Sequence, residues 1–198
     1  MDIKINSHHI RVNLMATQGL ILKEGAVLLV IDVQEKLFPH MAEKERLVKS
    51  IEKLISFAEI MKIPVLLTEQ YPKGLGHTIP EVKKLVPHIQ PIEKVEFNCL
   101  GSEKFKESLT QLKAKTLIIT GIEAHICVSQ TAIEGLSNGY RVCVIGDAVS
   151  SRSLEDKAIS LERMRQCGVT IASTEMIIYE LLKKAATPEF KKALKLVK

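Results

Sequence analysis

Short apolar runs recur along the chain and predict buried β-strands. The first spans residues 26–31 and ends at the carboxylate of Asp32. The others cover residues 64–68, 116–120, 141–145 and, in a shorter version, 169–172, and a weaker run lies at 92–95. Continuous apolar runs are typical of parallel strands, because both faces of a parallel sheet are covered. Five central strands and a weaker sixth are therefore expected.

Amphipathic helical patterns separate these runs. Two helix faces are indicated, one by Leu47, Ile51, Leu54, Ile55 and Ala58 and the other by Ile126, Ala132, Ile133 and Leu136. Asn138-Gly139 predicts a helix end, and Thr187-Pro188 predicts the start of a short last helix. Strand and helix thus alternate. With right-handed crossovers this order predicts an α/β, doubly wound, mainly parallel six-stranded sheet with helices on both faces, whose chemistry lies at the carboxyl ends of the strands.

The length and composition indicate a single globular domain. A chain of 198 residues can bury a sizeable core, and 46% hydrophobic with 26% charged residues excludes a disordered chain. We expect residues 25–198 to form the domain and residues 1–24 to form an N-terminal arm or an extra strand used in assembly. No apolar run approaches the ~20 residues of a membrane span, and the first residues carry no signal pattern, so a cytoplasmic protein without membrane contact is expected.

Charge and cysteine usage narrow the function classes further. The net charge of +5 comes from dispersed lysines, and only 4% of residues are aromatic, which argues against a nucleic-acid partner. The four cysteines form no Cys-x-x-Cys pair, so neither a zinc knuckle nor a dithiol redox motif is indicated. Reduced thiols are expected.

Three residues far apart in the sequence are candidates for chemistry. Asp32 ends the first predicted strand, where it either enters the crevice or caps the following turn. Cys127 falls in a predicted first helical turn, where the helix dipole favours a thiolate, although a small buried side chain is the alternative. Lys94 says nothing alone. Together a carboxylate can take the thiol proton while the ammonium favours the charged forms.

The segments around these residues resemble isochorismatase-like hydrolases in type, order and spacing. They are Val-Ile-Asp-Val-Gln at 30–34, Glu-Lys-Val-Glu-Phe at 93–97 and Thr-Gly-Ile-Glu-Ala-His-Ile-Cys-Val-Ser-Gln-Thr-Ala at 120–132. Residues 68–76, 146–153 and 161–169 are similar to the isochorismatase-domain-containing subgroup. The resemblance covers nearly everything from about Gly25 to the last helix. It implies a Rossmann-like three-layer fold and a triad of Asp32 as base, Lys94 as electrostatic partner and Cys127 as nucleophile.

The resemblance also implies further parts of the site. Family members carry a non-proline cis peptide before the nucleophile, which here joins Ile122 to Glu123, and its N–H and that of Cys127 would form an oxyanion hole. Nicotinamidases of the superfamily hold a metal after the second strand, but this chain offers only Glu69, Tyr71 and a distant His77 there. We therefore expect neither a metal nor another cofactor.

The predicted activity is hydrolysis of a C–N amide-type bond in a small molecule through an acyl-cysteine. True isochorismatases cleave a vinyl ether and lack the cysteine, so the presence of Cys127 favours acyl chemistry. Gln34, Phe38 and Tyr71 are the candidate substrate-pocket residues. A homo-oligomer is expected. The alternatives are a non-catalytic oligomeric scaffold of the same fold and a thiol-based redox protein, whose second thiol would have to be Cys99 or Cys143.

Overall fold

A computed structural model describes residues 19–197 and contains one six-stranded, all-parallel sheet. The strands are β1 (Ala26–Ile31), β2 (Val65–Gln70), β3 (Ile92–Lys94), β4 (Thr116–Ile122), β5 (Arg141–Ser150) and β6 (Thr170–Ala172). Their spatial order is β3-β2-β1-β4-β5-β6. The predicted fold class and all six strands are confirmed. Since the order reverses at β1 and β4, the topological switch point lies between these two strands.

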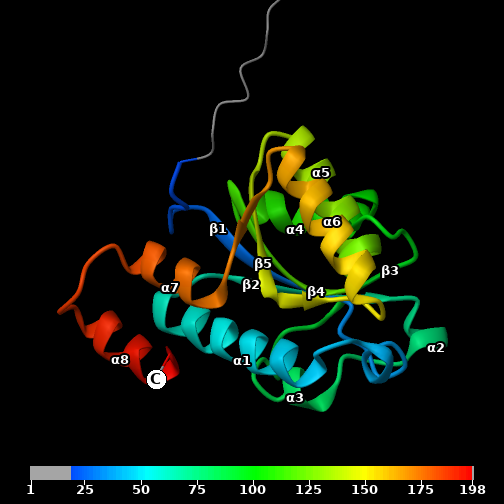
Figure 1. Cartoon of the computed structure of the whole chain (residues 1–198), viewed down its shortest axis with the longest axis horizontal. Helices are drawn as coiled ribbons and strands as arrows, with labels where there is room; N and C mark the ends of the chain where they lie inside the picture. The colour runs from blue at the N-terminus through cyan, green and yellow to red at the C-terminus, as the bar shows by residue number, and fades with distance from the viewer. Residues whose placement is uncertain (1–18, 198) are drawn as a thin grey trace, which may run out of the picture.

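Helices cover both faces of the sheet and make three layers (Figure 1). One face carries α1 (Lys44–Met61), α3 (Pro80–Lys83), α7 (Thr174–Leu182) and α8 (Pro188–Val197), and the other carries α4 (Glu103–Gln111), α5 (Ser129–Ser137) and α6 (Leu154–Gln166). The side chains of β1 alternate between the two layers of core: Leu28 and Val30 pack with α1, whereas Leu29 and Ile31 pack with α4 and α5. The central strand is therefore buried on both faces, as its apolar sequence predicts.

The predicted helix faces are found, with one change at the start of α5. All five apolar positions of the first face lie buried on α1. On the second face Ala132 is buried, while Ile133 and Leu136 are partly buried. However, α5 begins at Ser129, and a π-helical turn, η3 (Ala124–Val128), precedes it. Cys127 thus lies in a π-turn instead of the first turn of an α-helix, which the apolar spacing could not reveal.

The predicted N-terminal arm falls mostly on residues 1–18, which lie outside the described part. Residues 19–24 form no strand. Ile21 is buried there, and its backbone N–H donates to the Glu180 carboxylate of α7. Arg141 Nη1 donates to the carbonyl of Leu20 at 3.3 Å. This short segment therefore packs along the domain. Within residues 19–197, none of the helices has the length and apolar character needed to span a membrane.

Candidate active site

The three candidate residues meet at the carboxyl edge of the sheet, beside the switch point. Asp32 follows β1, Lys94 ends β3 and Cys127 lies in η3 after β4. Lys94 Nζ is 2.7 Å from Asp32 Oδ2 and 3.9 Å from Cys127 Sγ. Parallel strands place their carboxyl ends at one edge, so residues distant in sequence converge there. Asp32, Lys94 and Cys127 therefore lie close together, as predicted.

Asp32 is fully buried, and both of its carboxylate oxygens accept hydrogen bonds. Thr68 Oγ1 donates to Oδ1 at 2.6 Å, and Lys94 Nζ donates to Oδ2 at 2.7 Å. The Asp32 backbone adopts the left-handed region with φ of 52°, and its carbonyl accepts from the Gln34 N–H at 2.8 Å. A non-glycine residue in this region carries strain of about 1–3 kcal/mol, and such residues cluster at functional sites. The carboxylate is thus held by contacts from two neighbouring strands.

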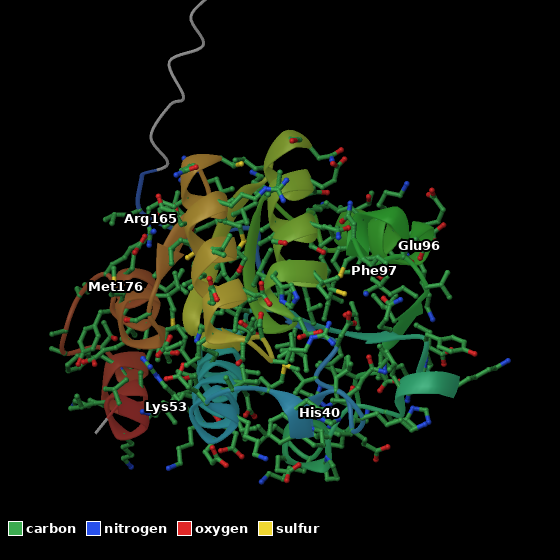
Figure 2. The ribbon with its side chains drawn as sticks, turned by 45° about the vertical axis from the view of Figure 1, so that its right-hand side comes forward. His40, Lys53, Glu96, Phe97, Arg165 and Met176 are labelled. Carbon is green, nitrogen blue, oxygen red and sulfur yellow. The ribbon has the colours of Figure 1, made fainter. Side chains whose placement is uncertain are left out.

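Lys94 forms an ion pair with Asp32 in which neither side chain is exposed. Its ammonium also donates to Gln70 Oε1 at 2.6 Å and to the carbonyls of Glu96 and Phe97 at 3.1 and 3.4 Å. Figure 2 shows Glu96 and Phe97 in the loop that follows β3. Burial by itself lowers the pKa of Lys94, but the charge of Asp32, the neighbouring thiols Cys99 and Cys127 and the hydrogen bond to Asp32 together outweigh it and raise that pKa above its ordinary value. The site therefore favours the ammonium form of Lys94.

The Cys127 thiol has a raised pKa, so the expectation of a helix-stabilised thiolate is wrong. The residue is only 6% exposed. Burial is the largest cause of the raised pKa, the Asp32 charge and a hydrogen bond to Asp32 add to it, and Lys94 opposes it. The π-turn further removes the simple helix N-terminus on which the expectation rested. The raised pKa favours a neutral Cys127 thiol beside the Asp32 carboxylate.

The turn between β4 and Cys127 depends on a glycine. Gly121 has φ of 111°, and a Cβ at this position would lie 2.1 Å from the carbonyl oxygen of Ile31. Only glycine permits this close approach of β4 to the end of β1. The next peptide, Ile122–Glu123, is cis. The Glu123 carbonyl accepts from the N–H groups of Ile126 and Val128 at 3.0 and 3.3 Å, which closes the π-turn that carries Cys127.

The buried carboxylate of Glu123 links this turn to the segment after β5. Its Oε2 accepts from the Arg152 backbone N–H at 3.2 Å and lies 3.4 Å from Arg152 Nε. Next to it, His125 Nδ1 lies 2.9 Å from Ser151 Oγ. Both contacts tie the η3 turn to residues 151–152. The side chain of Glu123 is therefore held away from free solvent by a polar contact of its own.

The three predicted pocket residues occupy different environments. Tyr71 is 54% exposed and lines a shallow depression with Pro72, Lys73, Glu93, Lys94 and Val95. Gln34 is buried, and its amide donates to the carbonyls of Gln70 and Gly76 at 3.0 and 2.7 Å and accepts from the Gln70 N–H at 2.7 Å. Phe38 packs against the core cluster around α1. Their contact with a substrate stays a prediction.

Glu69 and His77, the residues nearest to a metal box, pair with each other. Glu69 accepts from the N–H and hydroxyl of Thr78 at 2.7 and 2.8 Å, and His77 Nδ1 lies 3.0 Å from it. Burial by itself raises the pKa of Glu69, but the hydrogen bonds from Thr78 and His77 outweigh it and lower that pKa. The contact with Glu69 in turn raises the pKa of His77. Residues 19–197 contain no group of three His, Cys, Asp or Glu residues arranged to hold a metal ion.

The contacts of Thr68 and Gln70 with the site were not predicted from the sequence, and Cys99 was considered only as the second thiol of a redox protein. Thr68 ends the predicted strand, Gln70 belongs to the extension of β2 beyond it, and both are buried against Asp32 and Lys94. Cys99 is buried within electrostatic reach of Lys94 and Cys127, and burial raises its pKa to about 11. The available signal was that Thr68 ends an apolar run, and Gln70 follows it, at the same sheet edge as Asp32.

The sheet is doubly wound and all-parallel, and a buried carboxylate, ammonium and thiol lie at its switch point. This combination is typical of α/β enzymes. Sequence comparison makes this specific: the profile of the family described as Isochorismatase domain matches residues 26–176. This match covers more than half of the chain. The chain belongs to the isochorismatase family, and it is a hydrolase at the level that the family defines.

Named relatives resemble almost the whole chain. Isochorismatase domain-containing protein 2A of Mus musculus is 37% identical over 184 residues, covering 92% of this chain and 87% of the relative. Isochorismatase domain-containing protein 2 of Danio rerio is 38% identical and covers 92% of both chains. A solved structure of MAR1 ribonuclease from Caenorhabditis elegans is 36% identical, with a TM-score of 0.84 and coverage of 90% and 92%. These likenesses confirm the predicted family and fold.

Proposed function

We propose that this protein hydrolyses a C–N amide-type bond of a small molecule through an acyl-cysteine intermediate. One observation carries the proposal: a buried thiol, carboxylate and ammonium share one site at the switch point, with the ammonium 2.7 Å from the carboxylate and 3.9 Å from the sulfur. A nucleophile beside a base that a third group orients is the arrangement that covalent catalysis requires.

The neutral thiol of Cys127 fits a mechanism in which ionisation accompanies attack. Asp32 takes the thiol proton as Sγ bonds to the substrate carbonyl carbon. Lys94 stays protonated and, from 3.9 Å, stabilises the negative charge as it develops on sulfur. The N–H groups of Glu123 and Cys127 are the proposed donors to the carbonyl oxygen. Burial therefore keeps the thiol neutral in the absence of substrate, while Asp32 remains available to accept its proton.

The remaining steps return every group to its starting state. The carbonyl double bond reforms, the C–N bond breaks, and the proton held by Asp32 goes to the leaving nitrogen. Water then gives a proton to Asp32 while its oxygen attacks the thioester. Finally the C–S bond breaks and Asp32 returns the proton to the sulfur of Cys127. The products are an amine or ammonia and a carboxylic acid.

A thiol-based redox protein is the second candidate, and the position of Cys99 favours it. Cys99 contributes to the electrostatics of Cys127, whereas Cys143 packs in the core cluster around α1 on the other side of the sheet. Peroxide would oxidise the Cys127 thiol to a sulfenic acid and be reduced to water, and Cys99 could then condense with the sulfenic acid to a disulfide and a second water. A non-catalytic scaffold is the third class. The compact triad argues against it, because a buried charge pair costs desolvation free energy.

The test is a single-turnover assay on a panel of small amides, with mass detection of an acyl group on Cys127. We expect an adduct in the wild type and no turnover in Cys127→Ala. Cys127→Ser should be nearly inactive, because a hydroxyl is far harder to ionise than a thiol. RNA belongs in the panel, since a 36% identical relative is named a ribonuclease. Full hydrolysis by Cys127→Ala would refute the mechanism. If no amide is hydrolysed by the wild type and Cys127→Ser loses only peroxide-driven disulfide formation, the redox class is favoured.

A structural neighbour of this chain is described as an oligomer. YcaC of Escherichia coli, described as an octameric hydrolase of unknown specificity, shares the fold with a TM-score of 0.83 at 22% identity. We propose a homo-oligomer for this chain as well, working in the cytoplasm on a small molecule. A single monomeric species in light scattering at micromolar concentration would contradict this assembly.

A further inference from the structure

The carboxylate of Asp32 is oriented by two donors that approach from different strands. Lys94 on β3 donates to Oδ2, and Thr68 on β2 donates to Oδ1 at 2.6 Å. Thr68 lies between the two strand ends, is 1% exposed and pairs with Ile31 in the sheet register. Its hydroxyl hydrogen bond to an ionised group is short and shielded from water, which is the setting in which such bonds are strong.

The side chain of Cys99 lies next to the hydroxyl of Thr68. Burial raises the pKa of the Cys99 thiol, and the nearby hydroxyls of Thr131 and Thr68 oppose that rise. The Cys99 backbone N–H donates to Thr131 Oγ1 at 3.0 Å. A hydroxyl has one proton, and the proton of Thr68 is directed at Asp32. The Thr68 hydroxyl therefore donates to the proposed base from a buried position.

We propose that Thr68 is a positioning residue that holds the Asp32 carboxylate in the orientation in which it faces Cys127. This inference rests on the proposed function, because it concerns the base of that reaction. The other ionisable groups packed around Asp32 are Lys94 from β3, Cys127 from η3 and Cys99 from η2 (Cys99–Gly101). Thr68, in contrast, is a neutral hydrogen-bond donor to Asp32. The substitution Thr68→Val therefore removes the hydroxyl without changing the charge of the site and with little change in side-chain volume.

The measurable consequence is a shift in a pH profile. Alkylation of Cys127 should be nearly independent of pH wherever Asp32 is ionised and takes the thiol proton, and it should fall on the acid side where the carboxylate is protonated. The Thr68 hydrogen bond favours the ionised form. Without it, the acid-side fall should begin at a pH higher by about one unit, the size expected for one hydrogen bond to a charged group.

The experiment measures the rate of iodoacetamide alkylation of Cys127 by peptide mass spectrometry, from about pH 4 to about pH 9. The variants are Thr68→Val and Thr68→Ser, and the matched control is Thr120→Val. Thr120 is also a buried threonine of the sheet, but its hydroxyl donates to the Leu29 carbonyl at 2.8 Å. Thr68→Ala replaces Thr68→Val if the latter does not fold, as judged by its thermal unfolding.

We expect the acid-side fall to move upward by about one pH unit in Thr68→Val and to remain at the wild-type position in Thr68→Ser and Thr120→Val. A Thr68→Val profile that superimposes on the wild type, while the wild type keeps its flat region, overturns the role of Thr68 alone. If the wild-type rate rises about tenfold per pH unit throughout, as for an unassisted thiol, Asp32 is not the base and both proposals fail.

Discussion

Replacing Lys94 by methionine should destabilise the protein strongly, because it leaves the Asp32 charge buried without its partner. Both side chains of the pair are fully buried and lie 2.7 Å apart. Removing one partner of such a pair typically costs about 3–5 kcal/mol. Since domains of this size unfold with about 5–15 kcal/mol, the loss should be about a fifth of the total stability or more. Methionine keeps the length of the side chain, so the loss reports the charge.

The assay is equilibrium unfolding in urea at neutral pH, with Lys106→Met as the matched control. Lys106 pairs with Glu103 at 2.6 Å, a distance as short as that of the buried pair, but the two side chains are 45% and 80% exposed. Exposed ion pairs of this kind contribute about 0.2–1 kcal/mol. The midpoint for Lys106→Met should therefore stay close to the wild type, while that for Lys94→Met falls far below it.

A double variant separates the charge from packing. In Lys94→Met with Asp32→Asn no charge remains buried, so most of the lost stability should return. The reasoning is refuted if Lys94→Met loses no more free energy of unfolding than Lys106→Met. It is also refuted if the double variant is as unstable as the sum of the single variants, because the loss would then come from packing at two independent sites.

Three further predictions follow from other parts of the structure. Gly121→Ala should lose about 3 kcal/mol or more in urea unfolding, because its Cβ would overlap Ile31, whereas Gly139→Ala, with positive φ but open space, should lose about 1 kcal/mol. Burial raises the pKa of Cys143 from 9.0 to about 12, so the unfolded chain releases this proton at a lower pH than the folded protein does. The free energy of unfolding should therefore fall above about pH 9, by about 1.4 kcal/mol at pH 10. The fall should be shallower in Cys143→Ala, and equal slopes in the two proteins would contradict this prediction. Asp32→Asn should slow alkylation of Cys127 but not of partly exposed Cys167, and unchanged Cys127 labelling would contradict its role as base.

The strands could be predicted because a parallel sheet writes its burial directly into the sequence. Five apolar runs and a weak sixth became six strands, since helices cover both faces of the sheet and the central strands β1 and β4 are buried throughout. The ends were less predictable. β2 continues past its predicted end at Thr68 through Glu69 and Gln70, which look like loop residues because they are polar. These two residues, like Thr68, are buried because each finds a partner in the site or in the adjoining loop.

The chemistry of Cys127 was predicted only in part for a different physical reason. Its neighbours follow from the fold topology and the family resemblance, and these place Asp32 and Lys94 beside it. The pKa of the thiol depends instead on burial and on the balance of two nearby charges, and burial with Asp32 exceeds the effect of Lys94. A helix-dipole argument from sequence contains neither the burial nor the distances, so its sign was wrong.

The order of the strands explains why the site contains a lysine, Lys94, and two polar residues of β2, Thr68 and Gln70. Lys94 ends β3, and Asp32 follows β1, so β2 lies between them. Strands are about 4.8 Å apart, and the ammonium must therefore cross a whole strand to reach the carboxylate. Its four-carbon stem permits this, and Gln70 and Thr68 on the intervening strand supply an acceptor for the ammonium and a donor for the carboxylate. The ion pair is thus possible only because β2 becomes polar where it is crossed.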